Sequence, residues 1–465
     1  MAAKSKFQAI KGTRDLLPPE TELWNRAEQT AHDVFATFGF GEIRLPIFEP
    51  TELFARAVGG ETDIVSKEMY SFSDRPEDAP QPSRSAQSSG PAEGSKPTTR
   101  SDSPPLATRH SPLATSSISL RPEATASVCR AYIEHNMNQL PTPVKLYYIG
   151  PMFRRERPQK GRYRQFYQIG AEVLGGSDAP AIDAEVIEMV MVFFARLQLQ
   201  GVQLEINSIG CRDCRPQYVQ VLRAELLKVK DKLGPDSQRR IDTNPLRVLD
   251  SKVESEQAII TTLPRIGDHL CADCAKHYTE VKRQLAHRSV AFKENWRLVR
   301  GLDYYMRTTF EITAQGLGSQ NAVCGGGRYD GLVELLGGPP TKGIGFAIGE
   351  DRLILSLQGA GKGSVAQGRD VYIAWMGEKA LATAIRAARD LRQAGFRVEL
   401  PPVEQKFGKA LGQADKLGAR FALILGEDEV TTGQWTLKTL ADGSQSKFTE
   451  PQLLEFLRKT RIVSS

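Results

Sequence analysis

Hydrophobic and polar residues alternate most regularly between positions 145 and 174. Two apolar stretches there flank a loop rich in arginine, so the pattern predicts two strands joined by a basic loop. In the second strand, a period of two places Gln168, Gly170 and Glu172 on one face and the apolar residues on the other. One face can pack, while the other offers an amide and a carboxylate around a glycine gap.

The first strand adds a cation beside the same gap. Gly150, Met152 and Arg154 share a face by the same rule. A solvated basic hairpin is the usual alternative, but it does not explain two inward glycines beside Gln168 and Glu172. Arginine suits phosphate because its planar fork donates paired hydrogen bonds. The segment therefore predicts the floor of a pocket.

The same patterns divide the chain into domains. Residues 1–74, 118–204 and 294–357 mix strand and helix patterns and are predicted to form one α+β domain, interrupted by a helical insertion domain at 205–293. Residues 75–117 are dominated by Pro, Ser, Thr, Gly and Ala and are predicted to be a disordered insertion. Beyond 370, three short apolar runs alternate with helical stretches, which predicts a separate α/β domain at 370–465.

A glycine-rich stretch at 358–369 precedes that last domain. A phosphate-binding loop would need glycine at position 356 and serine or threonine at 363, but the chain has Ser356 and Gly363. The stretch is therefore predicted to be a linker.

Composition and charge narrow the class of protein only slightly. The 465 residues suggest about three domains, and 61 Lys+Arg against 55 Asp+Glu give a net charge of +6, which permits a phosphate-rich partner without requiring one. The N-terminus lacks the apolar core of a signal peptide, and no apolar run approaches the length of a membrane span. We therefore expect a cytoplasmic protein.

Four of the six cysteines form two C-x-x-C pairs, Cys211 with Cys214 and Cys271 with Cys274. Four thiolates could form a tetrahedral zinc site, but the pairs are farther apart in sequence than in a zinc ribbon. The sequence therefore favours buried or vestigial thiols and assigns no metal ligand. It leaves open that an insertion domain brings the pairs together.

Several stretches together resemble the histidyl-tRNA synthetases, a family of class II aminoacyl-tRNA synthetases. Residues 145–174 resemble motif 2, which holds ATP and the tRNA acceptor end. Residues 343–352 resemble motif 3, and residues 38–46 with the following helix resemble motif 1, the dimer-forming element. Further family signatures lie at residues 11–15, 120–126, 298–305 and 325–331. The resemblance covers nearly the whole chain except 75–117, and it implies an antiparallel catalytic sheet with a C-terminal anticodon-binding domain.

The resemblance also implies roles for individual residues. The amino group and backbone of histidine would be held by Glu123, Thr125 and Tyr304, the imidazole by Glu172 and Tyr305, and the carboxylate by Gln168 and Arg300. ATP would be bound by Arg154, Glu156, Arg162 and Arg352. Gln159 at the tip of the motif 2 loop would contact the extra 5′ guanosine of histidine tRNA. Ala124 replaces a glycine usual in the family, which adds a methyl group near the substrate.

The implied reaction has two steps. The histidine carboxylate attacks the α-phosphorus of ATP, and a ribose hydroxyl of tRNA(His) then attacks the histidyl-adenylate. Arg154 and Arg300 would be catalytic, because fixed cations stabilise charge that develops on phosphoryl oxygens. Mg²⁺ should accompany ATP, and motif 1 implies a homodimer.

Two rival functions are compatible with parts of the sequence. One is a catalytically silent, histidine-binding regulatory subunit of histidine biosynthesis, which usually lacks the C-terminal domain. The other is a synthetase-like tRNA sensor, which would be expected to have lost Arg154, Arg300 and Arg352. The complete motif set of this chain favours the enzyme.

Overall fold

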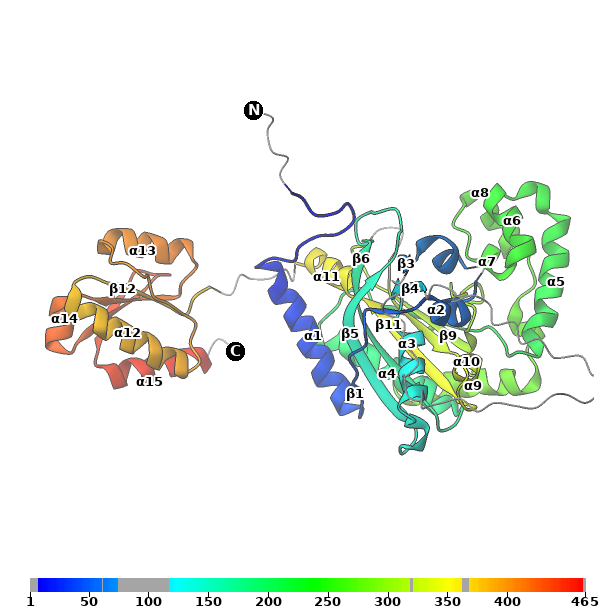
Figure 1. Cartoon of the computed structure of the whole chain (residues 1–465), viewed down its shortest axis with the longest axis horizontal. Coiled ribbons are helices and arrows are strands. Elements are labelled where there is room, and N and C mark those ends of the chain that lie inside the picture. The colour runs from blue at the N-terminus through cyan, green and yellow to red at the C-terminus, as the bar shows by residue number, and fades with distance from the viewer. Residues whose placement is uncertain (1–6, 61, 74–116, 318–320, 362–367, 463–465) are drawn as a thin grey trace, which may run out of the picture. The chain divides into compact units, whose positions relative to one another are not determined.

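A computed structural model describes residues 7–60, 62–73, 117–317, 321–361 and 368–462. The chain divides into a larger unit that includes residues 24–362 and a smaller one that includes residues 363–465. Both mix helices with sheets, so the predicted α+β class is confirmed (Figure 1). The predicted disordered insertion lies outside the described residues, apart from Ser117, which begins a strand. No helix in the described ranges is both long and apolar enough to cross a bilayer.

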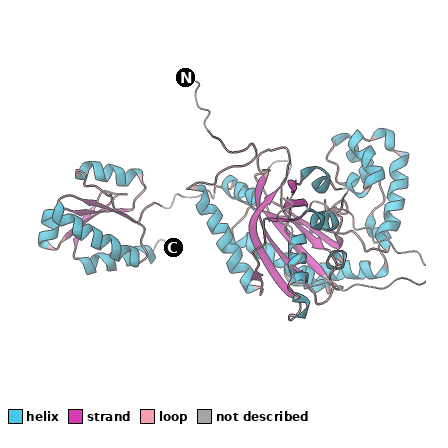
Figure 2. Ribbon diagram, in the orientation of Figure 1, coloured by secondary structure: helices cyan, strands magenta, loops and turns pink. Residues whose placement is uncertain are grey.

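An eight-stranded sheet forms the centre of the larger unit (Figure 2). Its six middle strands are antiparallel, whereas the first and last strands join the edges in parallel. The order across the sheet is β1 (Gly41–Glu42), β5 (Val144–Phe153), β6 (Gln165–Leu174), β11 (Gly343–Gly349), β10 (Ala322–Arg328), β9 (Met306–Thr313), β7 (Gln203–Ser208) and β8 (Lys293–Glu294). Strands β5 and β6 are the pair predicted on either side of the basic loop.

Helices α1 (Glu20–Thr37) and α4 (Pro180–Arg196) pack on one face of this sheet. Phe35 of α1 meets Tyr147 of β5 edge to face, with ring centroids 5.4 Å apart, and also contacts Phe193 of α4 and Phe346 of β11. Because side chains alternate along a strand, Tyr148 points to the opposite face. The polar residues of the candidate active site lie over that opposite face.

Over the opposite face lie three further helices and a small sheet. The helices are α2 (Thr51–Val58), α3 (Thr125–Glu134) and α10 (Leu332–Leu335). Helix α11 (Glu350–Gly359) instead lies beside α1, where Glu350 meets Glu28. The small sheet has the order β2 (Phe48–Pro50), β4 (Ser117–Leu120) and β3 (Ser71–Ser73). Helices α2, α3 and α10 share one buried core with β5. The helix expected after residues 38–46 is α2, which has eight residues, and the longer helix α1 precedes them.

The helical insertion has its own apolar core, built around residues such as Tyr218, Leu222 and Ile260. Its helices are α5 (Cys214–Lys228), α6 (Pro235–Thr243), α7 (Leu246–Leu249), α8 (Glu254–Thr261) and α9 (Ala272–His287). The predicted start at residue 205 is too early, because β7 still pairs with β9 of the catalytic sheet through Ser208. Alternating Leu204 and Ile206 belong to that sheet, so the insertion begins after β7.

The smaller unit has a five-stranded sheet in the order β13-β12-β14-β15-β16. Its parallel part, β12 (Val371–Trp375), β13 (Val398–Glu399) and β14 (Phe421–Leu425), alternates with α12 (Glu378–Gln393) and α13 (Phe407–Lys416) as predicted. After α14 (Glu427–Thr432), an antiparallel hairpin of β15 (Trp435–Thr439) and β16 (Gln445–Phe448) precedes α15 (Glu450–Ile462). The sequence patterns do not predict this hairpin. The predicted linker also starts two residues early, because α11 runs to Gly359.

Candidate active site

A row of facing residues crosses the open face of the large sheet. The strand register runs from Tyr148 of β5 through Gly170, Ala347 and Gly325 to Glu311 of β9. All of these except Gly170 line a cavity of about 370 Å³. Small residues in the middle of the row therefore leave room above the sheet, and larger polar residues stand at its ends.

The two inward glycines of the motif 2 strands do not leave the gap that the sequence predicts. A Cβ atom on Gly170 would lie 2.3 Å from the hydroxyl oxygen of Tyr148, and one on Gly150 would lie 2.6 Å from Nη2 of Arg121. Each glycine therefore makes room for a neighbouring side chain. The ring of Tyr148 and the guanidinium of Arg121 therefore fill the space beside Gln168 that the sequence predicts to be open.

Most of the residues singled out from the sequence line this one cavity. They are Glu123, Thr125, Arg154, Glu156, Arg162, Gln168, Arg300, Tyr304, Tyr305 and Arg352. Ala124 and Glu172 lie behind its wall, both buried. Ala124 occupies the N-cap of α3 and does not line the cavity, so its methyl group is not in contact with the space for substrate.

Glu172 is a buried carboxylic acid with two partners. Thr125 donates its hydroxyl to Oε1 at 2.7 Å, and Tyr329 donates its hydroxyl to Oε2 at 2.6 Å. Gly345 on the next strand has to be a glycine, since a Cβ there would clash with Oε2. Burial raises the pKa of Glu172 from its ordinary value to about 8. A neutral acid can therefore stand behind Thr125 at neutral pH.

Glu123 caps the helix that carries Thr125. Its two carboxylate oxygens accept backbone N–H groups of Thr125 at 2.7 Å and Ala126 at 3.0 Å. Acidic groups at a helix N-terminus satisfy otherwise unpaired amides and favour the helix dipole. Burial nevertheless raises the pKa of Glu123. The carboxylate thus reaches the cavity wall from a fixed position.

Arg300 lies flat over the sheet between Glu311 and Tyr305. Its Nη1 donates to Oε2 of Glu311 at 3.0 Å, and its guanidinium carbon lies 6.0 Å from the Tyr305 ring centre. Within the described structure, Nε of Arg300 and Oε1 of Gln168 are buried without a hydrogen-bond partner. Buried polar atoms are rarely left unpaired, so both atoms point to a polar ligand in this cavity.

Three arginines surround Glu156 at the other end of the cavity. Nη1 of Arg162 lies 3.3 Å from one carboxylate oxygen of Glu156, and Nη1 of Arg154 lies 3.9 Å from the other. Arg352, near the start of α11, donates to the backbone carbonyls of Gly161 and Ala322. Burial, reinforced by the charge of Arg162, lowers the pKa of Arg352. One carboxylate facing three cations leaves an excess of positive charge that suits a polyphosphate.

The tip of the loop between β5 and β6 is a tight turn. The backbones of Gln159 and Arg162 exchange hydrogen bonds of 3.1 and 2.9 Å, and Gly161 at the turn has a φ of +75°, which glycine adopts without strain. Gln159 is exposed at this tip, as predicted. The loop is anchored at its base, where the amide of Arg164 donates to the carbonyl of Gly12 at 2.7 Å.

Sequence reasoning misses three residues of this site. Tyr148 and Glu311 stand at the two ends of the floor, and Tyr329 holds the buried acid Glu172. Period-two alternation is enough to place Tyr148 on the face of Gly150. The strand partner of Gly325 cannot be read from the sequence, so nothing in it points to Glu311.

The cysteine pairs lie outside this cavity, in the insertion. Their four Sγ atoms all lie within 4.8 Å of one another. The sequence favours thiols without a metal because the two pairs are far apart along the chain. In the fold the pairs nevertheless meet, because the start of α9 lies beside the start of α5.

Comparisons with known proteins agree with this geometry. A family model described as "Histidyl-tRNA synthetase" matches residues 100–353, and one described as "Anticodon binding domain" matches residues 370–460. A histidine–tRNA ligase from Solibacter usitatus is 50% identical over 448 residues, which is 96% of this chain and 98% of that protein. One from Koribacter versatilis is 49% identical over 456 residues, 97% of this chain and 96% of that protein.

Solved structures show the same relationship. The crystal structure of apo histidyl-tRNA synthetase from S. aureus superposes with a TM-score of 0.74 at 33% identity and covers 97% of this chain and 100% of its own. The similarity extends through the C-terminal unit, which regulatory subunits usually lack, and thus favours the enzyme over the rival functions. The motifs, the cavity and these relatives together place the chain in the histidyl-tRNA synthetase family of class II aminoacyl-tRNA synthetases.

Proposed function

We propose that Arg154 and Arg300 are the catalytic residues with which this histidine–tRNA ligase activates histidine. The observation that carries the proposal is the pair of unpartnered polar atoms in the cavity wall, Nε of Arg300 and Oε1 of Gln168. A histidine carboxylate bound there would accept from Nε–H of Arg300 and from the amide N–H of Gln168, and Oε1 of Gln168 would accept from the histidine ammonium group. The attacking carboxylate would thus lie between the amino-acid end of the cavity and its arginine-rich end.

At the amino-acid end, Glu123, Thr125 and Tyr304 bind the amino group of histidine. Glu123 supplies a negative charge, and the helix cap fixes its position. Tyr305 and Glu172 recognise the imidazole, which has one N–H donor and one acceptor when neutral. The hydroxyls of Thr125 and Tyr329 already donate to the two carboxyl oxygens of Glu172. Glu172 can therefore bind the imidazole directly only if one of these hydroxyls rotates away. Otherwise it acts on the substrate through Thr125.

At the opposite end, Arg154, Arg162 and Arg352 bind the phosphates of ATP, and Glu156 holds the first two arginines in place. Charge develops on the phosphoryl oxygens as the carboxylate attacks, and preorganised cations stabilise that charge without reorganisation. Arg154 is well placed for this, since its Nε donates to the carbonyl of Pro122 at 2.9 Å and its guanidinium packs over Phe166. Fixed cations cost nothing to orient during the reaction.

ATP enters as its Mg²⁺ complex. Magnesium favours phosphate oxygens with one or two carboxylates, and the cavity offers Glu156 and Glu311 for that purpose. The ion neutralises the pyrophosphate leaving group. The residues of the cavity thus fit a substrate-bound ion and do not form a separate cage.

The second substrate is tRNA(His). Gln159, exposed at the tip of the motif 2 loop, contacts the extra 5′ guanosine, and the C-terminal unit reads the anticodon. Since the partner is tRNA, the enzyme works in the cytoplasm, where proteins are synthesised.

The working form is a homodimer. One face of the small sheet carries Phe48, Phe72, Ile118 and Leu120, because the register pairs Phe48 with Leu120 and Phe72 with Ile118. Phe48 is 55% exposed and Phe72 is 51% exposed. The opposite face is polar and satisfied, with Ser119 bonded to Thr51 and Ser71. An apolar sheet face open to water is typical of an interface, and it directly follows the motif 1 segment.

Histidine-dependent exchange of labelled pyrophosphate into ATP tests the proposed activation step. The parent enzyme should exchange, and Arg300→Ala should lose most of the rate while it still binds tRNA(His). Absence of exchange in the parent, with active controls, would return the chain to the regulatory-subunit function.

A further inference from the structure

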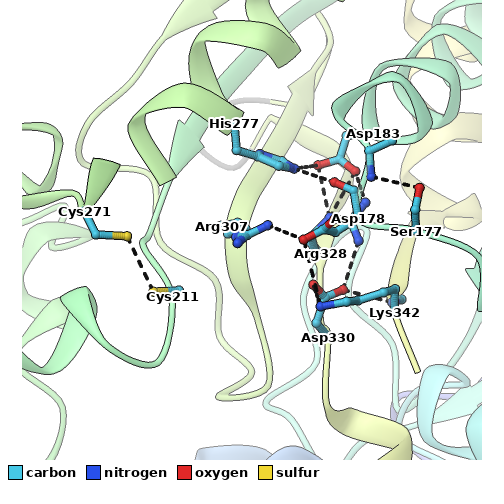
Figure 3. Close-up of polar contacts among 12 residues, drawn as sticks. Ser177, Asp178, Asp183, Cys211, Cys271, His277, Arg307, Arg328, Asp330 and Lys342 are labelled. Atoms are coloured by element: carbon cyan, nitrogen blue, oxygen red, sulfur yellow. Dashed lines mark hydrogen bonds and ion pairs between the residues drawn. The ribbon is translucent and has the colours of Figure 1, made fainter. Parts of the chain in front are cut away.

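The four cysteines of the insertion form one compact group of sulfur atoms. The Sγ of Cys211 lies 3.7 Å from that of Cys214 and 3.9 Å from that of Cys271, and all four sulfurs lie within 4.8 Å of one another. Figure 3 shows Cys211 and Cys271 facing each other from two different segments. Two pairs that are 60 residues apart in sequence therefore meet.

These separations fit the edges of a tetrahedron around one metal ion. A Zn–S bond of about 2.3 Å in tetrahedral geometry places neighbouring sulfurs about 3.8 Å apart. A disulfide would require about 2.05 Å between two of them. An iron–sulfur cluster sets several irons and sulfides between the thiolates, and so requires a wider cage. The observed spacing matches a single ion best.

Two helix N-termini converge on the same point. Cys214 is the first residue of α5, whereas Cys271 is the N-cap of α9 and Cys274 lies in its first turn. The positive end of each helix dipole favours thiolates. Backbone amides reinforce this, since Cys211 donates to Sγ of Cys214 at 3.3 Å and Asp213 donates to Sγ of Cys211 at 3.4 Å. Such amide donors are the usual outer shell of a thiolate-bound metal.

The surrounding structure holds the two halves of the group in place. His277 of α9 lies 3.1 Å from the carbonyl oxygen of Asp178, and Arg307 of β9 donates to the Asp178 carboxylate at 2.7 Å (Figure 3). On the other side, Gly210 adopts a φ of +71°, and a Cβ there would lie 2.8 Å from Sγ of Cys214. The contacts of His277 and Arg307 with Asp178 position α9 without the sulfurs, and the glycine at 210 leaves room for Sγ of Cys214.

Burial and charge suit a closed site. Cys274 is fully buried, Cys211 and Cys214 are nearly so, and Cys271 is half-buried. Four thiolate ligands fill a tetrahedral shell, so no position is left open for a substrate. Arg215 and Arg307 lie close enough to interact electrostatically with the cysteines. Two positive charges beside four thiolates offset the net charge of −2 that a tetrathiolate zinc site carries.

We propose that Cys211, Cys214, Cys271 and Cys274 bind one Zn²⁺ as a structural site. The site fastens both ends of the helical insertion to the catalytic sheet. Met306, the first residue of β9, packs against the cysteines, and Arg215 donates to the backbone carbonyl of Tyr305. Zinc therefore braces the segment that carries Tyr304 and Tyr305.

Metal analysis of the full-length protein tests this. The protein is purified without chelator from medium that supplies both zinc and iron. We expect about one zinc per chain in the parent and in Cys129→Ala, which removes a buried cysteine outside the group. Cys271→Ser/Cys274→Ser should lose most of the zinc. Replacement by Co²⁺ should give the visible and thiolate charge-transfer absorption of tetrahedral cobalt in parent and control alone.

A parent that carries no zinc, carries iron instead, or has a disulfide among these cysteines in mass spectra would overturn the proposal. If the double variant fails to fold, the parent protein is treated with a thiol-modifying reagent. Zinc should be released in proportion to the modification of these four cysteines. Release of zinc without their modification would also overturn the proposal.

Discussion

Gly325 lies directly beneath the guanidinium of Arg300. A Cβ atom built on Gly325 would stand 2.2 Å from Nη2 and 2.4 Å from Cζ of Arg300, far inside van der Waals contact. Glu311, the strand partner of Gly325, accepts a hydrogen bond from the same guanidinium. The glycine of β10 therefore sets the height at which the cation rests above the sheet, and a larger residue at this position would lift the guanidinium away from Glu311.

Gly325→Ala should displace Arg300 without unfolding the protein, because alanine is compatible with a strand. We expect the activation rate to fall toward the loss caused by removing an oxyanion-type donor, about 10²–10³-fold. Gly301→Ala is the matched control, since a Cβ there meets only Nη1 of Arg247 at 3.8 Å. Pyrophosphate exchange measures both variants. Equal rates in the two would show that the position of Arg300 does not matter.

Arg300→Ala should slow adenylate formation far more than transfer to tRNA. Its proposed work is to stabilise charge during the first step, so we expect a loss of about 10²–10³-fold there. Mutant enzyme given preformed histidyl-adenylate should still charge tRNA(His). Single-turnover assays separate the steps. Equal slowing of both steps would make Arg300 a general scaffold of the site and exclude the activation-specific role.

The parts of this site that can be predicted from the sequence share one property. They lie on strands where the period of two is strict, so alternation by itself puts Gln168 and Arg154 on the face that lines the cavity. The strands at 371–375 and 421–425 are predictable for a similar reason, as short apolar runs between helices. The identity of the ligands comes from resemblance to a family and not from periodicity.

The parts that cannot be predicted depend on contacts between distant segments. Gly170 suggests open space in the sequence, but Tyr148 fills that space across the hairpin. The cysteine pairs are far apart in sequence, but the fold of α9 brings them together. The β15–β16 hairpin escapes prediction because its short strands alternate only weakly and because Asp442 and Gly443 lie in a four-residue loop, not in a two-residue Asp-Gly turn.

Glu172→Gln should change how stability depends on pH. Burial raises the pKa of Glu172 to about 8, so between its ordinary value near 4.5 and about 8 the folded protein holds a proton that the unfolded chain releases. The folded state therefore loses stability as the pH rises through that window. Glutamine has no proton to lose. The melting temperature of the variant, measured without substrate, should fall less from pH 5 to pH 8 than that of the parent, and parallel curves would contradict the raised pKa.

Gln159→Ala should impair the use of tRNA and spare activation. The side chain is exposed at the loop tip and does not line the cavity, whereas an amide can pair with base edges. Pyrophosphate exchange should stay nearly unchanged, while charging slows and discrimination between tRNA with and without the extra 5′ guanosine narrows. Lys160→Ala, at the adjacent turn position, is the control for loss of a nonspecific phosphate contact. If mutant and parent discriminate equally, Gln159 does not recognise that guanosine.

Phe48→Glu/Phe72→Glu should convert the proposed dimer to monomers. The two rings share one exposed face of the small sheet, and a carboxylate buried there without a partner would cost several kcal/mol, roughly the desolvation penalty of an unpaired polar group or more. Light scattering at micromolar concentration should give the parent twice the chain mass of 51.4 kDa and the variant one chain mass. Ile385→Glu replaces an apolar residue of similar exposure on α12 and should leave the mass of the dimer unchanged.

A parent protein that is monomeric throughout would exclude the homodimer. A double variant that stays dimeric would place the interface on another surface, because two charges facing each other across an apolar sheet face cannot remain in contact.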